Sequence, residues 1–472
     1  MPSPRLATTS LCLALGALQL TSVAASTATP PPELFSPLIA QKVLATAQTQ
    51  HNPPQYPQWT DRTAGAWQYF NPDTWTSGFF PATLYALNAR AALCPNTSTA
   101  QGLNGTDWLA LAQTWSAAEV PSETNTTVGH DVGFLSFPFA DELAVHPDNQ
   151  SAITAVNDFA KELAARFSPI VGCTRSWDTA DPTDFQVIID NMMNLEVLFV
   201  SANLTGNNTL RDIATSHADK TRINHLRPDG SSFHVVEYNS TTGDVIRQRT
   251  AQGYADNSTW SRGQSWGIYG FANMFKHTGN VTYLETSRSM AKYFLTNMPD
   301  DGIVPWDFNA PLTPPRPADS SAAMIAANGL LLLSQGELAL SPPNTTGADY
   351  YTNAAIELIA NMTALAWRPE WQSLLANGTV NNPELNNLTG IVYGDYYFVN
   401  AGNELISLGL IDCNGNLTGN NETAPSSIAN VSTSATNTAS SDSASQSTSS
   451  ASQITAGSSM FAVAASLLAL LL

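Results

Sequence analysis

Between residues 33 and 412, apolar residues recur mainly with the spacing of amphipathic helices. The first run is typical, because Leu34, Leu38 and Ile39 fall on one side of a helix. Polar connections that contain Pro or Gly separate the runs. The pattern predicts twelve helices, over residues 34–50, 76–93, 106–119, 133–145, 150–167, 188–202, 207–219, 262–277, 281–297, 320–337, 348–366 and 394–410.

In one stretch, apolar and polar residues alternate instead of following a helical spacing. Residues 231–250 alternate on both sides of a turn at 239–243, which predicts a β-hairpin inserted before the eighth helix. Twelve helices make six pairs, and six pairs that close on themselves form an all-α (α/α)6 toroid. An open solenoid of helix pairs is the alternative, but it requires atypical capping repeats, and the sequence shows none.

Chemically distinctive residues gather at the starts of the even-numbered helices. In a closed toroid these starts lie at one end, so a single funnel would collect carboxylates, aromatic rings, Arg262 and six helix N-termini. Aromatic walls with few polar groups suit a sugar ring. Helix N-termini and an arginine suit an anionic sugar. The segments are 73–79, 130–134, 190–194, 260–266, 319–321 and 394–397.

Asp190 is the most promising carboxyl group of this set. It follows Val187-Ile188-Ile189 and precedes Met192-Met193, so burial should raise its pKa. The alternative is that Asp190, like Asp73 and Asp319, serves as a helix N-cap.

The other distinctive side chains also have structural alternatives. His130 beside Asp131 could form a local hydrogen-bonded turn. Trp75, Trp260 and Trp266 could belong to the core.

The composition narrows the class of protein. The 472 residues include 19 Lys or Arg and 38 Asp or Glu, for a net charge of −19, which excludes nucleic-acid binding by phosphate neutralisation. Cys94, Cys173 and Cys413 allow one disulfide in three possible pairings, or free buried thiols. No Cys/His cluster suggests zinc, and neither a metal nor an organic cofactor is implied.

Both ends of the chain have the pattern of processing signals. We expect a secretory signal peptide over 1–25, a catalytic domain over 26–415, a Ser/Thr-rich stalk over 416–459 and a hydrophobic tail over 460–472. The tail fits a glycosylphosphatidylinositol anchor signal, with possible attachment to a membrane or cell wall. Sixteen Asn-x-Ser/Thr sequons fit a secreted, cell-surface glycoprotein.

Several of these motifs together resemble glycoside hydrolase family 88, the unsaturated glucuronyl hydrolases. The resemblance covers about residues 60–410, and family members are (α/α)6 barrels. The matching segments are His130–Phe134, Ile189–Leu195, Pro228–His234, Gln252–Tyr254, Trp260–Phe271, Trp306–Phe308, Asp319–Ala323 and Gly394–Tyr397.

The resemblance implies a hydrolase that acts on oligosaccharides left by polysaccharide lyases. Such fragments end in a uronic acid with a C4=C5 double bond, which the family hydrates, so that the aglycone is lost from the resulting hemiketal. Asp190 would be the acid that protonates C4, and Asp131 would raise its pKa and stabilise the cationic transition state.

The remaining roles also follow from the resemblance. His234, Gln252 and Arg262 would hold the carboxylate and hydroxyls of the substrate. Trp75, Trp260 or Trp266 would stack on its rings. Two alternatives stay open for the function: an unsaturated rhamnogalacturonyl hydrolase, and a non-catalytic, wall-anchored carbohydrate-binding protein.

Overall fold

The computed structural model describes residues 28–49 and 51–418, and the α-helix is the main element in these ranges. Helical periodicity in the sequence therefore predicted the architecture well. The helices are α1 (Pro37–Ala47), α2 (Phe79–Leu93), α3 (Trp108–Ala117), α4 (Val132–Leu135), α5 (Phe137–Val145), α6 (Gln150–Ala165), α7 (Glu196–Thr205), α8 (Asn208–Asn224), α9 (Ser261–Thr278), α10 (Val281–Thr296), α11 (Ser320–Leu338), α12 (Thr345–Ala366) and α13 (Val392–Ser407).

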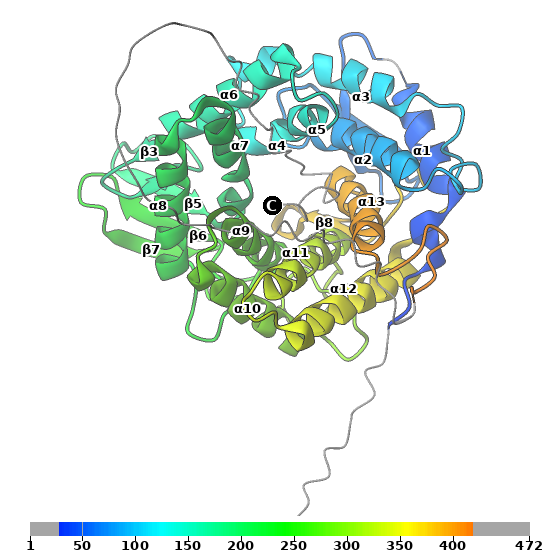
Figure 1. The fold of residues 1–472 in the computed structure, drawn as a ribbon. Coiled ribbons are helices and arrows are strands. Elements are labelled where there is room, and N and C mark those ends of the chain that lie inside the picture. Colours follow the sequence, from blue (N-terminus) through cyan, green and yellow to red (C-terminus); the bar gives the residue numbers. More distant parts are fainter. Residues whose placement is uncertain (1–27, 50, 419–472) are drawn as a thin grey trace, which may run out of the picture.

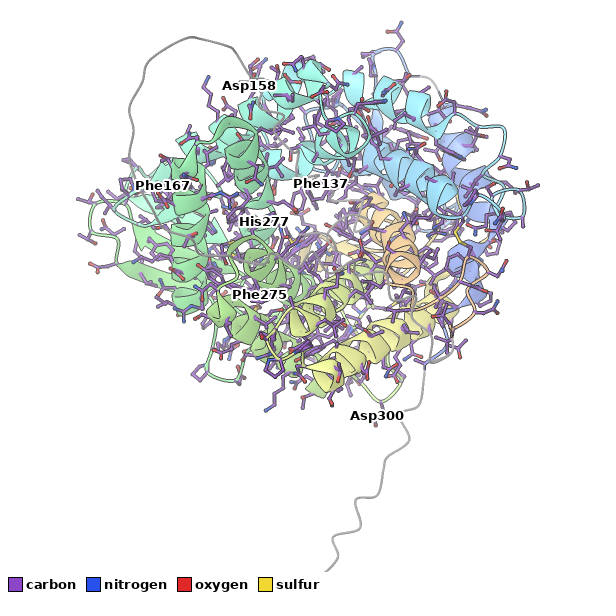
Figure 2. The ribbon with its side chains drawn as sticks, viewed as in Figure 1. Phe137, Asp158, Phe167, Phe275, His277 and Asp300 are labelled. Atoms are coloured by element: carbon purple, nitrogen blue, oxygen red, sulfur yellow. A yellow bond between two sulfur atoms is a disulfide. The ribbon has the colours of Figure 1, made fainter. Side chains whose placement is uncertain are left out.

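The helices form two concentric rings (Figure 1). The inner ring consists of α2, α5, α7, α9, α11 and α13, and α1, α3, α6, α8, α10 and α12 cover it from outside. Inner helices such as α11 are buried on nearly every side, whereas the outer α6 has one buried face. Figure 2 shows side chains crowding the inside of the ring, His277 of α9 among them. The predicted (α/α)6 toroid of six helix pairs is confirmed.

The last inner helix closes the ring against the first. The guanidinium of Arg90 in α2 donates 2.8 Å to the carbonyl of Val399 in α13. A disulfide then joins Cys94, just after α2, to Cys413, just after α13. Cys173 is a free, buried thiol. Of the three pairings that the sequence left open, the structure has this one.

Strands are more numerous than the sequence predicted. The predicted hairpin is present as β6 (Val235–Asn239) and β7 (Val245–Arg249), and β5 (Asp184–Ile188) adds a third antiparallel strand to it. Three further small antiparallel pairs were not predicted. They are β1 (Tyr56–Thr60) with β2 (Trp67–Phe70), β3 (Phe167–Ser168) with β4 (Cys173–Thr174), and β8 (Gly378–Asn381) with β9 (Asn386–Thr389).

Two predicted helices differ from the observed ones. The helix expected over 133–145 is divided at Ser136 into α4 and α5, with Pro138 in the first turn of α5. The helix expected over 188–202 begins only at Glu196, because 184–188 is a strand and Ile189–Met193 is a 3-10 turn. As a result of both differences, chemically distinctive residues of the segments 130–134 and 190–194 lie in short turns just before helices.

Six segments lead into the inner helices, and we call them the mouth loops. They contact one another around one end of the ring: Trp59 bridges Ile391, Trp260 bridges Asp307, and Nδ1 of His130 lies 3.0 Å from the carbonyl oxygen of Ser176. The mouth loops are residues 51–78, 118–131, 166–195, 225–260, 297–319 and 367–391.

The expected processing signals cannot be followed in the fold. The expected signal peptide, the hydrophobic tail and nearly all of the stalk lie outside the described residues. Within the described ranges, no helix combines the length and the apolar character needed to cross a bilayer.

Candidate active site

The predicted site residues come from four mouth loops and the first two turns of α9. Asp131 ends a 3-10 turn before α4, and Asp190 lies in the 3-10 turn after β5. Trp260 is the N-cap residue of α9, and Arg262 is in its first turn. Because inner helices begin at the same end of the toroid, residues far apart in sequence meet here.

Asp190 is a buried carboxyl group with an unused oxygen. The residue is 7% exposed, and its Oδ1 has no hydrogen-bond partner. Burial raises the pKa of Asp190 to about 7, although the positive charge of Arg262 acts to lower it. At neutral and acidic pH, a large fraction of Asp190 therefore carries a proton.

Asp131 interacts electrostatically with Asp190. Burial, and next the charge on Asp190, raise the pKa of Asp131 well above its ordinary value, while the Asn194 side-chain amide opposes the shift from 3.4 Å. The side chain of Asp131 is 16% exposed, so it reaches the open side of the site. Burial and the neighbouring Asp190 carboxylate therefore both favour the protonated form of Asp131.

The side chain of His130 also affects the protonation of Asp131. Its Nδ1 lies 3.0 Å from the carbonyl oxygen of Ser176, which can only accept, so Nδ1 carries the hydrogen. Burial lowers the pKa of His130 to about 3, so the ring is neutral and Nε2 has a lone pair. This nitrogen lies 3.2 Å from Oδ1 of Asp131. Two acceptors would repel at that distance, so the geometry favours a protonated Asp131.

Arg262 is surrounded by protein acceptors. Nη1 donates 2.7 Å to Asp319 and also to the carbonyl of Thr379, and Nη2 donates 2.7 Å to Gln252 and 2.7 Å to the carbonyl of Val380. Four of its five N–H groups are therefore engaged. Its charge still acts on the site, but its main contacts hold β8 and Gln252 in place.

Arg262 also packs against two rings. The guanidinium carbon lies 4.6 Å from the ring centre of Trp260 and 5.6 Å from that of Tyr393.

His234 and Gln252 present hydrogen-bond donors. Nδ1 of His234 accepts the backbone N–H groups of Ala251 and Gln252 at 3.2 and 3.3 Å, so its hydrogen is on Nε2, which has no partner. Burial lowers the pKa of His234 well below its ordinary value, and the charge of Arg262 adds to this. Because Oε1 of Gln252 accepts from Arg262, its NH2 group remains as a donor.

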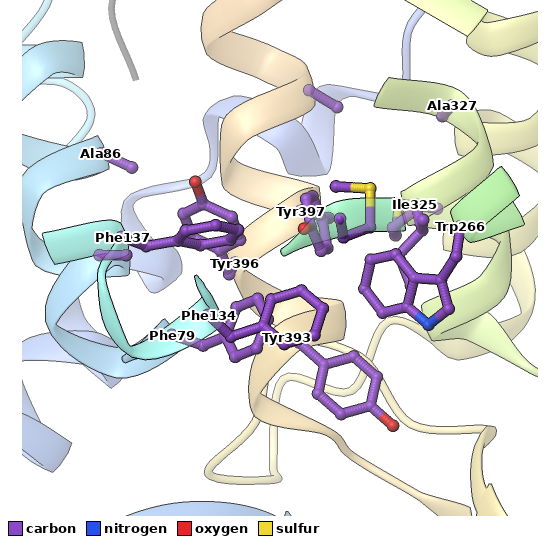
Figure 3. Close-up of a cluster of buried hydrophobic side chains, with 14 of the residues drawn as sticks. Phe79, Ala86, Phe134, Phe137, Trp266, Ile325, Ala327, Tyr393, Tyr396 and Tyr397 are labelled. Carbon is purple, nitrogen blue, oxygen red and sulfur yellow. The ribbon is translucent and has the colours of Figure 1, made fainter. Parts of the chain in front are cut away.

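The predicted aromatic residues differ in how deeply they are buried. Trp266 is 1% exposed and packs 5.4 Å from Phe134 and 5.7 Å from Tyr397, between ring centres, so it lies in the core floor (Figure 3). Trp75 is only partly buried, and its ring lies 5.0 Å from that of Tyr393. Trp75 is therefore better placed than Trp266 to present a ring face.

Other carboxylates that the sequence singled out stabilise the framework. Asp319 caps α11, accepting from the backbone of Ser321 and Ala322, and also binds Arg262. Asp395 accepts the backbone N–H groups of Leu374 and Leu375. The N-cap alternative is thus observed for Asp319 but not for Asp190, whose turn has no side-chain cap.

Three neighbouring residues had no assigned role in the sequence analysis. Tyr393 precedes the Gly394–Tyr397 segment directly, and Asn194 lies inside the quoted Ile189–Leu195 motif. Trp177, in a loop without periodicity, packs at 5.9 Å from His234. For Tyr393 and Asn194, their places beside or within a motif were the signals available, whereas nothing in the sequence pointed to Trp177. In the described part of the chain, no three His, Cys, Asp or Glu side chains gather in a way that could hold a metal ion.

Comparison with known proteins decides the family. Over 333 residues, the chain is 36% identical to an unsaturated glucuronyl hydrolase of Formosa agariphila, which covers 69% of this chain and 78% of that protein. The chain belongs to the unsaturated glucuronyl hydrolase family. An unsaturated glucuronyl hydrolase of Bacillus sp. strain GL1 is 35% identical over 280 residues, 58% of this chain and 73% of that protein.

Solved structures of this family share the fold. The crystal structure of the Bacillus sp. GL1 unsaturated glucuronyl hydrolase superimposes with a TM-score of 0.67 at 28% identity, covering 79% of this chain and 95% of that one. The structure of an unsaturated glucuronyl hydrolase specific for heparin superimposes with a TM-score of 0.70 at 28% identity, covering 81% of this chain and 98% of that one. No protein-family model matches the chain. The chain is a glycoside hydrolase of the unsaturated glucuronyl hydrolase type, as its motifs indicated.

Proposed function

We propose that the enzyme removes the 4,5-unsaturated uronic acid from the non-reducing end of oligosaccharides that polysaccharide lyases produce. The observation that carries this proposal is Asp190, a buried and largely protonated carboxyl group with an unused oxygen at the mouth. The relatives support the substrate class: the Bacillus sp. GL1 enzyme is described as responsible for glycosaminoglycan degradation, and a family variant was crystallised with dGlcA-Glc-Rha-Glc.

The reaction follows from one proton transfer. Asp190 gives its proton to C4 of the C4=C5 bond, and positive charge develops at C5 and on the ring oxygen. Water adds to C5 and returns a proton to the Asp190 carboxylate. The hemiketal opens to a ketone at C5, and the aglycone leaves from C1 as an alcohol. Asp131 stabilises the cationic transition state only after it loses the proton that the neutral His130 ring favours.

The predicted binding residues have distinct parts in this proposal. Nε2–H of His234 and the NH2 group of Gln252 donate to the uronate carboxylate, and Arg262 supplies positive charge from behind. Trp75, which is only partly buried, contacts the sugar face, whereas Trp260 (3% exposed) and Trp266 (1% exposed) belong to the buried part of the site.

Loss of ultraviolet absorbance tests the proposal, because hydration removes the conjugated double bond. Incubation with an unsaturated glucuronyl disaccharide should bleach the absorbance, and the Asp190→Asn variant should not. If no unsaturated glucuronide is bleached by the folded wild-type enzyme, the proposal is wrong. A pectin-derived unsaturated rhamnogalacturonyl fragment, run in parallel, distinguishes the neighbouring activity.

We also propose that the enzyme is secreted, glycosylated and attached to the cell surface by a lipid anchor. The Cys94–Cys413 disulfide supports an oxidising compartment. Sequon residues Asn207 and Asn280 are exposed N-caps that use only Oδ1 for capping, so a glycan on Nδ2 is compatible with the fold. Release by phosphatidylinositol-specific phospholipase C and a mass loss on enzymatic deglycosylation test the two parts. An enzyme found inside the cell would contradict both.

A further inference from the structure

A row of buried hydrogen bonds supports the turn that carries Asp190. The turn is the 3-10 segment Ile189–Met193, which has no side-chain cap, and its second residue after Ile189 is the fully buried Asn191. The side-chain amide of Asn191 donates 2.9 Å to Oγ1 of Thr174 and 3.2 Å to the carbonyl oxygen of Thr174. Because Asn191 follows Asp190 directly, these bonds fix the backbone beside the reacting carboxyl.

The other side of Thr174 is held by His217 in the outer helix α8. Nδ1 of His217 accepts the backbone N–H of Thr174 at 3.1 Å and lies 3.0 Å from the Thr174 hydroxyl oxygen. Both residues are 0% exposed, and burial lowers the pKa of His217 to about 3, so its ring is neutral. A backbone N–H can only donate, so Nδ1 has the lone pair and the ring hydrogen is on Nε2.

This backbone donor decides the direction of each bond in the row. Since Nδ1 of His217 is an acceptor, the Thr174 hydroxyl donates to it, because two lone pairs would repel at 3.0 Å. The hydroxyl oxygen then faces Asn191 as an acceptor, and the NH2 end of the amide points towards it. The reversed amide would place an oxygen against the carbonyl of Thr174, which can only accept. The row therefore has one favourable arrangement.

The segment 174–176 also supports the turn that carries Asp131. The carbonyl oxygen of Ser176 lies 3.0 Å from Nδ1 of His130, the residue before Asp131. Oγ of Ser176 accepts the backbone N–H of Ile188 at 3.0 Å, just before the other turn. Both turns are thus bonded to one short segment, so a shift of that segment would change how the two carboxyl groups lie relative to each other.

We propose that His217 and Thr174 are positioning residues for the reaction, and that they act through Asn191 to hold the Asp190 carboxyl in line with the carbon that it protonates. This rests on the proposed function and deepens it. Both side chains are 0% exposed, so they cannot touch the sugar. A misplacement of about 1 Å can slow a reaction about a hundredfold. Misalignment affects proton transfer more than sugar binding, so the loss should appear in kcat rather than in KM.

Two substitutions at position 217 separate the acceptor from the rest of the ring. Asparagine places Oδ1 where Nδ1 of histidine stands, whereas leucine, which has the same branched shape, places a methyl group there. His217→Leu should lower kcat at least about tenfold on an unsaturated glucuronyl disaccharide, with KM nearly unchanged. His217→Asn should keep most of the wild-type kcat. Equal losses in the two variants would overturn the proposal, because the missing ring volume would then explain both.

Substitutions of Thr174 test the link between His217 and Asn191. Thr174→Val keeps the shape of the side chain but removes the hydroxyl, and it should lower kcat several-fold, whereas Thr174→Ser should remain near wild type. When Thr174→Val is added to His217→Leu, kcat should fall no further, because both residues serve one row of bonds. Losses that multiply in the double variant would show that the two side chains act separately, which would contradict the proposal.

Thr352→Val is the matched control for a threonine that is only structural. Thr352, in the outer helix α12, is 9% exposed, and its hydroxyl lies 2.9 Å from that of Ser334. This variant should lose stability in urea and keep its kcat. If Thr174→Val also loses stability but keeps its kcat, the proposal is wrong. If the folded wild-type enzyme cleaves no unsaturated glucuronide, the proposed function fails instead, so the two failures are distinguishable.

Discussion

The Asp190→Asn substitution should abolish turnover and, at the same time, stabilise the fold at neutral and alkaline pH. Burial raises the pKa of Asp190 from its ordinary value of 3.8 to about 7. Between these values, the unfolded chain releases a proton that the folded protein retains. The free energy of unfolding therefore falls as pH rises from about 4 to about 7, and it levels off above that range.

The magnitude follows from the size of the rise in pKa. Each tenfold change in proton affinity is worth about 1.4 kcal/mol, so the cost at pH 8 reaches about 4 kcal/mol. Asparagine has nearly the same shape and cannot ionise, so the variant avoids this cost. At pH 4 the carboxyl is protonated in the folded wild type, and the two proteins should be nearly equally stable.

Urea unfolding of both proteins at pH 4 and pH 8 measures the effect, and loss of absorbance measures activity. Glu119→Gln is the matched control, because Glu119 is 0% exposed, neither oxygen has a partner, and burial raises its pKa well above the ordinary value. This variant should also gain stability at pH 8 but keep its kcat/KM. A stability difference between Asp190→Asn and wild type that is the same at both pH values would refute the reasoning.

Other predictions concern the pH profile, two supporting side chains and the disulfide. Because Asp190 must be protonated to act, kcat/KM measured across pH 4–9 should fall about tenfold per pH unit above about 7. His130→Gln replaces the acceptor Nε2 with an amide donor, which favours ionisation of Asp131. The negative charge on Asp131 would raise the pKa of Asp190, so the alkaline limb of the kcat/KM profile should move to higher pH. An unmoved limb would contradict the tautomer assigned to His130. Arg262→Lys loses the planar fork among its four acceptors and should lower the unfolding free energy by about 2–4 kcal/mol, measured in urea. Reduction of the Cys94–Cys413 disulfide should lower the free energy of unfolding by about 2–5 kcal/mol, measured as a lower Tm in the presence of dithiothreitol. An unchanged Tm would show that the disulfide does not stabilise the closed ring.

Helical periodicity predicted the toroid because inner and outer helices differ in how much of their surface is apolar. The small sheets were harder to detect. β1 is only five residues long, contains Pro57 and has an irregular register near Trp59, so it gives no clear alternation. β8 and β9 consist largely of Asn, Gly and Thr, which is typical of loops. Their positions depend on contacts with distant segments.

The candidate site shows the same limit. The apolar neighbours of Asp190 predicted its burial and the direction of its pKa shift, since both are local. The tautomer of His130 depends on Ser176, forty-six residues away. The occupation of Arg262 depends on carbonyl groups more than a hundred residues away. Sequence motifs therefore identified the participants, but not which of their hydrogen-bonding groups are still free.

The closed ring has a consequence for biosynthesis. Because α13 fills the space between α2 and α11, the apolar flank of α2 has no cover until nearly the whole chain has left the ribosome. The Cys94–Cys413 bond spans 319 residues and can form only after that last helix arrives. A nascent chain truncated before α13 should therefore bind chaperones that recognise exposed apolar surface, and release from them should coincide with completion of the circle.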